Sequence, residues 1–142
     1  MATPKDNDAR KFWRLAKQRL TEAKQVLQIQ LWALAEYVGG YAVECSLKAL
    51  VLGVTPENER PKAGEATIEW MKTEFGHELD NLRRHLSARG ARMPSDVARE
   101  FLFVATWNPQ QRYEPGPGDP KRAERFIRAA DSVVKWADGR TA

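Results

Sequence analysis

Tyr37-Val-Gly-Gly-Tyr-Ala-Val-Glu-Cys-Ser-Leu-Lys-Ala-Leu-Val-Leu52 is the stretch that decides the fold. It is the most apolar part of the chain, and it lacks the alternation of a half-buried strand. Its apolar or small residues recur instead every three or four positions, which is the spacing of a helix. The residues with this spacing are Leu31, Leu34, Ala35, Val38, Ala42, Cys45, Ala49 and Leu52. We therefore expect a buried central helix that ends at Gly53.

Two features of this helix stand out. Gly39 and Gly40 in mid-helix cost roughly 1 kcal/mol each relative to alanine, so we expect another backbone to approach closely there. A polar stripe holds Tyr37, Tyr41, Glu44 and Lys48. Glu44 precedes Lys48 by four residues, which is the favourable order for an ion pair on one helix.

The rest of the chain also has helical periodicity, and nothing alternates at period two over a useful length. We expect an amphipathic helix over 8–27, helices over 65–75 and 77–89, a short helix from Ser95 to about Thr106, and a last helix from Pro120 to Gly139 with Asp119 as its cap. Residues 55–64 and 107–118 are rich in proline and glycine and are expected to be loops. The predicted fold is all-α: an up-down bundle of three long helices and one to three short ones.

Length and composition narrow the class of protein. The 142 residues predict one domain over 8–139, preceded by a disordered N-terminus over 1–7. The single cysteine, Cys45, excludes an internal disulfide and a cysteine-rich zinc site, and its place in the apolar pattern favours a buried hydrophobe over a nucleophile. The two histidines have no metal-type partner at helical spacing, so we expect no metal and no cofactor.

The N-terminal sequence and the net charge bear on the cellular location and the partners of the protein. The N-terminus is polar and charged, which argues against a signal peptide, and no run was expected to be long enough to span a membrane. We therefore expect a cytoplasmic protein without a membrane partner. The formal net charge of +4 permits a nucleic-acid partner without requiring one.

Three segments resemble the HEPN family, small helical domains that are widespread in prokaryotes. Gly40 to Ala49 resembles the signature of that family's second helix. Gly76-His77-Glu78-Leu79, followed by Leu82, resembles its Gly-His-x-Leu-x-x-Leu segment, and Trp107 to Tyr113 resembles its Trp…Arg-Tyr segment before the last helix. The segments occur in the family's order, and the resemblance covers about residues 10–138. The resemblance implies the same helical bundle, often as a homodimer.

The resemblance also suggests a function. Many HEPN proteins are metal-independent ribonucleases in which a histidine follows an arginine after four to six residues. In this chain no arginine precedes either histidine at that spacing, and no histidine follows Arg112. We therefore expect a non-catalytic binding or interaction module. It would be a dimer that partners a small nucleotidyltransferase, as in toxin–antitoxin couples, or that binds a nucleotide. The alternatives are a variant RNA-cleaving enzyme and, from the basic charge alone, a structural protein that binds nucleic acid.

The candidate binding residues are Arg112, Tyr113, His77, Glu44 and Lys48; no residue is assigned a catalytic role. Arginine offers a planar fork for phosphate, and tyrosine a ring for stacking. Each residue also has a structural interpretation. Arg112 could pair with an acid such as Glu44 to pin its loop, Tyr113 could pack, His77 could cap a helix, and Glu44 with Lys48 could form an ion pair on the helix surface.

Overall fold

The computed structural model describes residues 7–60 and 64–140. Within these residues the chain forms six α-helices, two short 3-10 helices and no strand. The helices are α1 (Asn7–Gln28), α2 (Trp32–Val54), α3 (Glu65–Phe75), α4 (Leu79–Ala88), α5 (Ser95–Val104) and α6 (Pro120–Arg140); the 3-10 helices are η1 (Glu57–Glu59) and η2 (Pro109–Tyr113). The prediction of an all-α bundle with three long and several short helices is confirmed.

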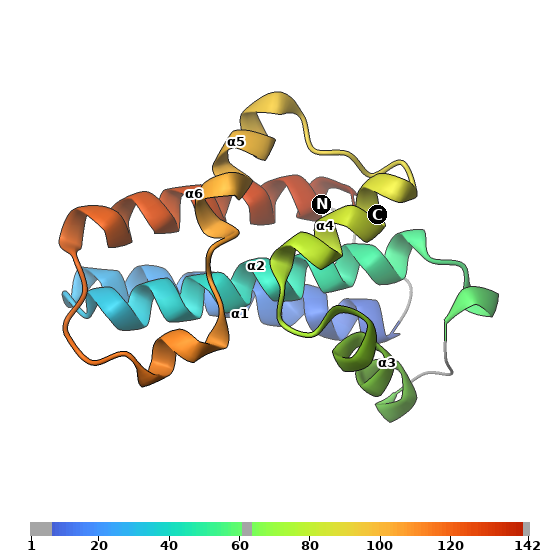
Figure 1. The fold of residues 1–142 in the computed structure, drawn as a ribbon, viewed down its shortest axis with the longest axis horizontal. Coiled ribbons are helices and arrows are strands. Elements are labelled where there is room, and N and C mark those ends of the chain that lie inside the picture. The colour runs from blue at the N-terminus through green and yellow to red at the C-terminus, as the bar shows by residue number, and fades with distance from the viewer. Residues whose placement is uncertain (1–6, 61–63, 141–142) are drawn as a thin grey trace.

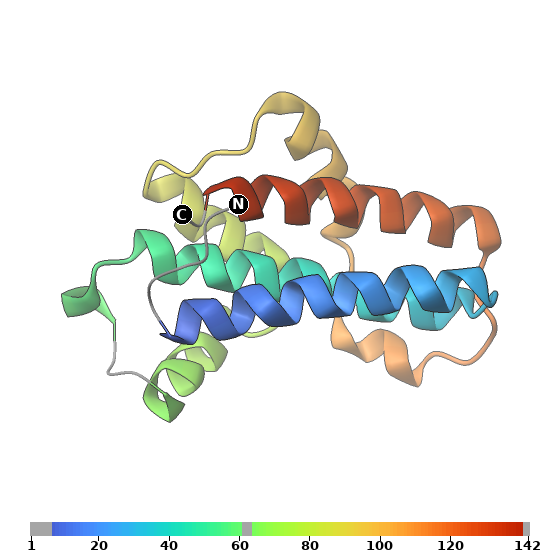
Figure 2. The ribbon, with the colours of Figure 1, turned by 180° about the vertical axis from the view of Figure 1, so that it is seen from behind.

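The three long helices form the body of the molecule. α1 and α2 make an antiparallel hairpin, and α6 packs along both of them (Figure 1). α4 covers the C-terminal half of α2, α5 packs on α6, and η2 packs on the N-terminal half of α2. Seen from behind, α1 lies in front of α2 for most of its length (Figure 2). α2 is therefore the central helix.

Small side chains let α1 and α2 approach each other closely. Ala9, Ala16 and Ala23 are fully buried along one face of α1, together with Leu20. The hairpin turns at Gln30, whose φ of 66° is unusual for a residue other than glycine. Its amide donates to the carbonyl of Leu27 at 3.1 Å, which closes the turn. The predicted break between the first two helices lies at this turn.

α2 meets the length and composition of a membrane span, which corrects the expectation that no run is long enough. Among the described residues it is the one helix that does so, and 72% of its most apolar window is buried inside the bundle. The other helices of the bundle therefore surround most of this apolar helix.

Side chains, rather than the expected backbone, make the close approach at the two central glycines. A Cβ added at Gly40 would overlap the indole ring of Trp107, and one added at Gly39 would lie 2.8 Å from Cδ1 of Ile127 in α6. Trp107 is 2% exposed and donates from Nε1 to the carbonyl of Tyr37 at 3.1 Å. The glycines therefore make room for the segment before η2 and for α6.

Most predicted helix boundaries agree with the structure. α3 has the predicted bounds, and Gly76 follows it with a φ of 58°. Asp119 caps α6 as expected, since its Oδ2 accepts from the backbone amide of Arg122 at 2.7 Å. Gly139 does not end α6, which runs to Arg140. α1 begins at Asn7, and the rest of the segment predicted to be disordered lies outside the described residues.

Two other boundaries and one loop differ from expectation. α2 continues through Gly53 to Val54, because the hydroxyl of Thr55 donates to the carbonyl of Val51 at 2.6 Å and Gly53 has open space around it. α4 begins at Leu79, so His77 lies in the turn before it. The loop over 107–118 contains η2, whose first turn is capped by the side chain of Asn108.

The two glycines at positions 40 and 53 provide a matched test of the packing. We expect Gly40→Ala to lower the free energy of unfolding by about 1–3 kcal/mol, because the new methyl group collides with Trp107. Gly53→Ala should leave it unchanged or raise it by up to about 1 kcal/mol, because alanine favours the helix and meets nothing. Urea unfolding measures both, and a Gly40→Ala variant as stable as Gly53→Ala would contradict the packing described above.

Candidate functional site

A buried carboxylate at the middle of α2 brings together three of the five predicted site residues. The side chain of Glu44 is 5% exposed. Its Oε2 lies 3.3 Å from Nζ of Lys48, one turn further along α2, and its Oε1 lies 2.9 Å from Nδ1 of His77. We call Glu44, Lys48 and His77 the Glu44 cluster.

Lys48 lies inside the bundle. The residue is 6% exposed, and its ammonium stands 5.9 Å from the ring centre of Phe12 in α1. The pair with Glu44 is therefore buried, unlike the surface ion pair that the sequence suggested. A buried carboxylate needs a cation close by, since an unpaired buried charge is costly. Lys48 supplies that cation for Glu44.

His77 lies in the turn between α3 and α4, with its side chain 52% exposed. The turn is fixed by Gly76, by the buried side chains of Phe75 and Leu79 on either side, and by Asn81. The amide of Asn81 donates to Oε2 of Glu78 at 3.1 Å and also faces the carbonyl of Phe75. The histidine is therefore held at the surface by a closed turn and not by a helix of its own.

The contact with Glu44 decides which ring nitrogen of His77 carries its proton. An ionised carboxylate only accepts hydrogen bonds, so Nδ1 must donate to Oε1 of Glu44. Nε2 is then the nitrogen available to an outside group. It accepts a proton or hydrogen bond when the ring is neutral, and it donates when the ring is charged.

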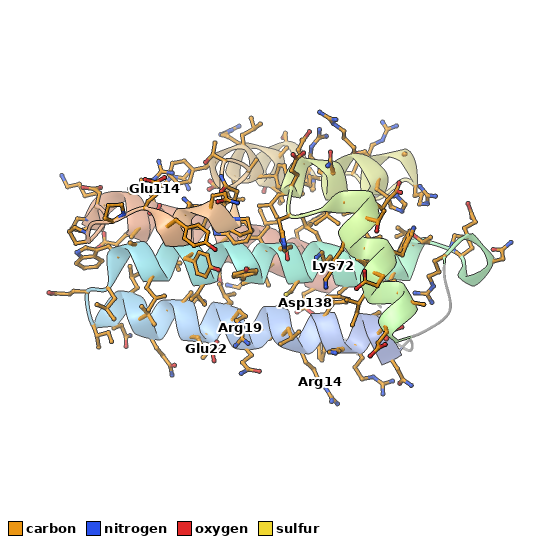
Figure 3. All side chains as sticks on the ribbon, turned by 60° about the horizontal axis from the view of Figure 1, so that its bottom comes forward. Arg14, Arg19, Glu22, Lys72, Glu114 and Asp138 are labelled. Atoms are coloured by element: carbon orange, nitrogen blue, oxygen red, sulfur yellow. The ribbon has the colours of Figure 1, made fainter. Side chains whose placement is uncertain are left out.

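The other two predicted residues, Arg112 and Tyr113, belong to η2. Tyr113 is 67% exposed, and the side chain of Arg112 lies outside the part of the chain that the structure describes. η2 packs on the N-terminal half of α2. Figure 3 shows Glu114, directly after η2, and Lys72, in α3, towards opposite ends of α2. The backbone of η2 thus lies towards the N-terminal end of the central helix, and the Glu44 cluster lies at its middle.

Cys45, next to Glu44, has the chemistry of a neutral thiol. Burial raises its pKa to about 11, and the charge of Glu44 adds to this effect. The thiolate is the nucleophilic form of cysteine. At neutral pH the side chain therefore behaves as the small hydrophobe that the sequence predicts, although it is only partly buried.

His85, the second histidine, connects α4 to the end of α2. Its Nε2 lies 2.9 Å from the hydroxyl of Thr55, and its ring packs edge-on against Phe75. Since the Thr55 hydroxyl already donates to Val51, Nε2 must donate to Thr55. Nδ1 then faces the Arg89 guanidinium at 3.4 Å. Burial lowers the pKa of His85, and Arg89 lowers it further, so the ring is neutral at pH 7.

Two further residues of interest give only weak signals in the sequence. Asn81 fixes the turn of His77, and its only signal is an amide side chain five residues after the helix-stopping Gly76. Glu36, on α2, is a second buried carboxylate. Its signal is an acid inside an apolar helical pattern, between Ala35 and Tyr37, which could have been weighed beside Glu44.

A double-mutant cycle measures the buried pair in the Glu44 cluster. We expect Glu44→Gln to cost about 3–5 kcal/mol of unfolding free energy, because it leaves the Lys48 ammonium buried without its carboxylate. Glu44→Gln combined with Lys48→Met removes both charges and should cost less than Glu44→Gln alone. Urea unfolding of the variants, with Lys48→Met as the fourth corner, tests this. A loss of unfolding free energy in the double variant equal to the sum of the two single losses would contradict a coupled pair.

The neutral state of His85 predicts a pH dependence of stability. The unfolded chain binds a proton at this histidine below about pH 6.5, while the folded chain resists it because the pKa is lowered. Lowering the pH through this window therefore favours unfolding. We expect the wild type to lose stability relative to His85→Gln as the pH falls from neutral, measured by urea unfolding at several pH values. A difference between the two proteins that does not change with pH would contradict the assignment.

Comparison of the chain with models of known protein families, with curated proteins and with solved structures found no match. The likeness to the HEPN family therefore rests on the three sequence segments around Glu44, His77 and Arg112.

Proposed function

We propose that this chain is a HEPN-like binding and interaction module that takes an anionic group, such as the phosphate of a nucleotide or of RNA, at His77. The observation that carries the proposal is the half-exposed His77 ring, held at Nδ1 by the buried carboxylate of Glu44 at 2.9 Å. The contact with Glu44 already restricts the His77 side chain, while part of its ring is exposed to solvent. Binding of a ligand therefore costs little further side-chain entropy.

The charges of the Glu44 cluster support an anionic ligand. Lys48 already balances Glu44 inside the bundle. A proton on His77 therefore gives the cluster one net positive charge, located at the surface. Nε2 of a protonated histidine donates a charge-assisted hydrogen bond, which is stronger and shorter than a neutral one. Phosphate oxygens are suitable acceptors for it.

The arrangement favours binding over turnover. RNA cleavage without metal needs a group that moves a proton and a cation that steadies the scissile phosphate, both at one site. Lys48 is buried and engaged with Glu44, so it does not meet a substrate. The backbone of η2, which carries Arg112, packs nearer the N-terminal end of α2, whereas Glu44 lies at its middle. Among the described side chains in contact with the Glu44 cluster, only the first of the two groups is therefore present.

The second candidate is a variant metal-independent ribonuclease. The specific observation in its favour is the same Glu44–His77 contact, because a carboxylate that holds Nδ1 leaves Nε2 poised as a general base. In this hypothesis the cation comes from Arg112 of a second copy of the chain. The binding module remains our proposal because it needs no such group.

The resemblance to the HEPN family extends the proposal to assembly. We propose a cytoplasmic homodimer that pairs with a small nucleotidyltransferase in a toxin–antitoxin-like system. Exposed apolar side chains support a surface for association: Ile29, Leu31 and Leu34 are each at least 45% exposed and lie together at the turn between α1 and α2. Contiguous exposed apolar groups are typical of interaction sites.

Binding of a labelled single-stranded RNA and of a labelled nucleotide, measured by fluorescence anisotropy at low salt, tests the proposal. We expect His77→Gln to weaken binding about tenfold, the loss of one charge-assisted hydrogen bond. His85→Gln is the matched control, since it removes the other histidine and should leave affinity unchanged. Equal affinities for the wild type and His77→Gln would refute the site.

The same RNA, incubated with the protein without metal, distinguishes the two candidate functions. We expect it to remain intact with the wild type, with His77→Gln and with Arg112→Ala. Cleavage by the wild type that disappears in both variants would establish the ribonuclease and overturn the non-catalytic proposal.

A further inference from the structure

A pocket lies away from the Glu44 cluster, where the connection between η2 and α6 crosses the first turns of α2. Its volume is about 180 Å³. α2 contributes Ala33 and Glu36, η2 contributes Gln111, and the connection contributes residues between Glu114 and Gly118. Figure 3 marks the position of this connection by Glu114. Glu114, Pro115 and Gly116 are exposed, so the pocket opens to solvent on their side.

The walls of this pocket are fixed by contacts between α2 and the connection. The amide of Ala33, which has no partner within its own helix, donates to the carbonyl of Pro117 at 3.1 Å. Gly118 has a φ of 81°, and a Cβ there would lie 2.8 Å from the nitrogen of Ala33. Only glycine allows the connection to pass so closely over the helix start.

Two buried oxygen atoms belong to residues that line the pocket. Glu36 is 8% exposed, and both its Oε1 and the Oε1 of Gln111 are buried without a hydrogen-bond donor in the described part of the chain. Nε of Arg122 lies 2.9 Å from Oε1 of Glu36, which is an ion-pair distance, but the pair is not aligned as a hydrogen bond. A buried acceptor without a donor costs about 1–3 kcal/mol, so a rotation of either side chain that turns its oxygen towards a donor in the pocket would be favourable.

The acidic residues that line the pocket indicate which kind of hydrogen-bond donor it would bind. Glu36 and Glu114 both line it, and its lining includes no lysine or arginine among the described residues. Burial raises the pKa of Glu36 above its usual range, which the nearby Arg122 guanidinium opposes. A cation that brings several N–H groups would favour the ionised carboxylate and satisfy more than one acceptor.

We propose that this pocket binds a guanidinium group. The guanidinium ion is planar and presents its N–H donors as a fork, which suits a carboxylate and a neighbouring amide oxygen at once. The volume is far above the roughly 10–15 Å³ that one water molecule needs. A small free guanidine compound and an arginine side chain from a partner present the same group, so both are candidate sources.

Amide NMR with methylguanidinium as the probe tests the proposal. We expect saturable shifts of the Gln111 side-chain amide and of the backbone amides of Ala33 and Gly118. Affinity should fall at least tenfold in Glu36→Gln, which keeps the shape of the side chain and removes its charge. Gln111→Met is a second variant with the same expected direction, in case Glu36→Gln alters the fold. Tetramethylammonium is the control ion, because it carries the charge without any N–H group and should cause no saturable shift.

A comparison of two ligands identifies the source of the guanidinium group. Binding of both methylguanidinium and N-acetyl-arginine amide would support an arginine side chain, whereas binding of methylguanidinium alone would support a small free ligand. No saturable shift, an equal response to tetramethylammonium, or unchanged affinity in both variants would show a water-filled pocket and overturn the proposal. His77→Gln should bind methylguanidinium like the wild type, so this inference and the proposed function fail independently.

Discussion

The contact between Gly40 and the indole of Trp107 is the constraint on which the rest of the structure depends. No side chain larger than hydrogen fits on α2 at this point, because the ring occupies the space of a Cβ. The ring is also tied to α2 by its hydrogen bond to the carbonyl of Tyr37. Trp107 joins α5 to η2, so this contact fixes where the whole segment between α5 and α6 crosses the central helix.

Two buried carboxylates lie on either side of that contact. Glu36, Gly40 and Glu44 follow one another at intervals of four residues, so they lie along one side of α2 with Trp107 over the middle position. Each carboxylate meets a different environment. Glu44 has two partners, Lys48 and His77, whereas Glu36 has the unaligned Arg122 and an open pocket. Both candidate sites therefore arise from acids on the most apolar helix of the chain, where charge is most costly to leave unsatisfied.

The sequence predicted those parts of the structure that depend on local chemistry. The stop of α3 at Gly76 and the cap of α6 at Asp119 are both fixed by neighbouring residues. Two helix boundaries differ from the prediction because a residue just beyond the expected boundary decides it. Gly53 was expected to end α2, but the hydroxyl of Thr55 closes the helix after it. His77 was placed inside a helix, but the buried Leu79 begins α4 and leaves the histidine in the turn.

The candidate site was predicted in part, for the same physical reason. Glu44 and Lys48 share a helix face, which a repeat of four residues indicates directly. His77 joins them only because α4 folds back onto α2, which no local pattern specifies. The pocket at Glu36 depends on the path of the chain from Glu114 to Gly118, and that path is set by contacts of Pro117 and Gly118 with Ala33, which lies far away in the sequence.

Packing, rather than charge, is the means by which the two sites could influence each other. Eight residues of helix separate Glu36 from Glu44, a rise of about 12 Å, and each carboxylate has a cation nearer than that. The indole of Trp107 lies between them and touches α2 on the one face that both acids share. A ligand that displaced η2 would therefore shift the ring of Trp107. This displacement would affect Glu44 more than the charge of the ligand would. Close-packed side chains transmit such displacements because they leave no free volume to absorb them.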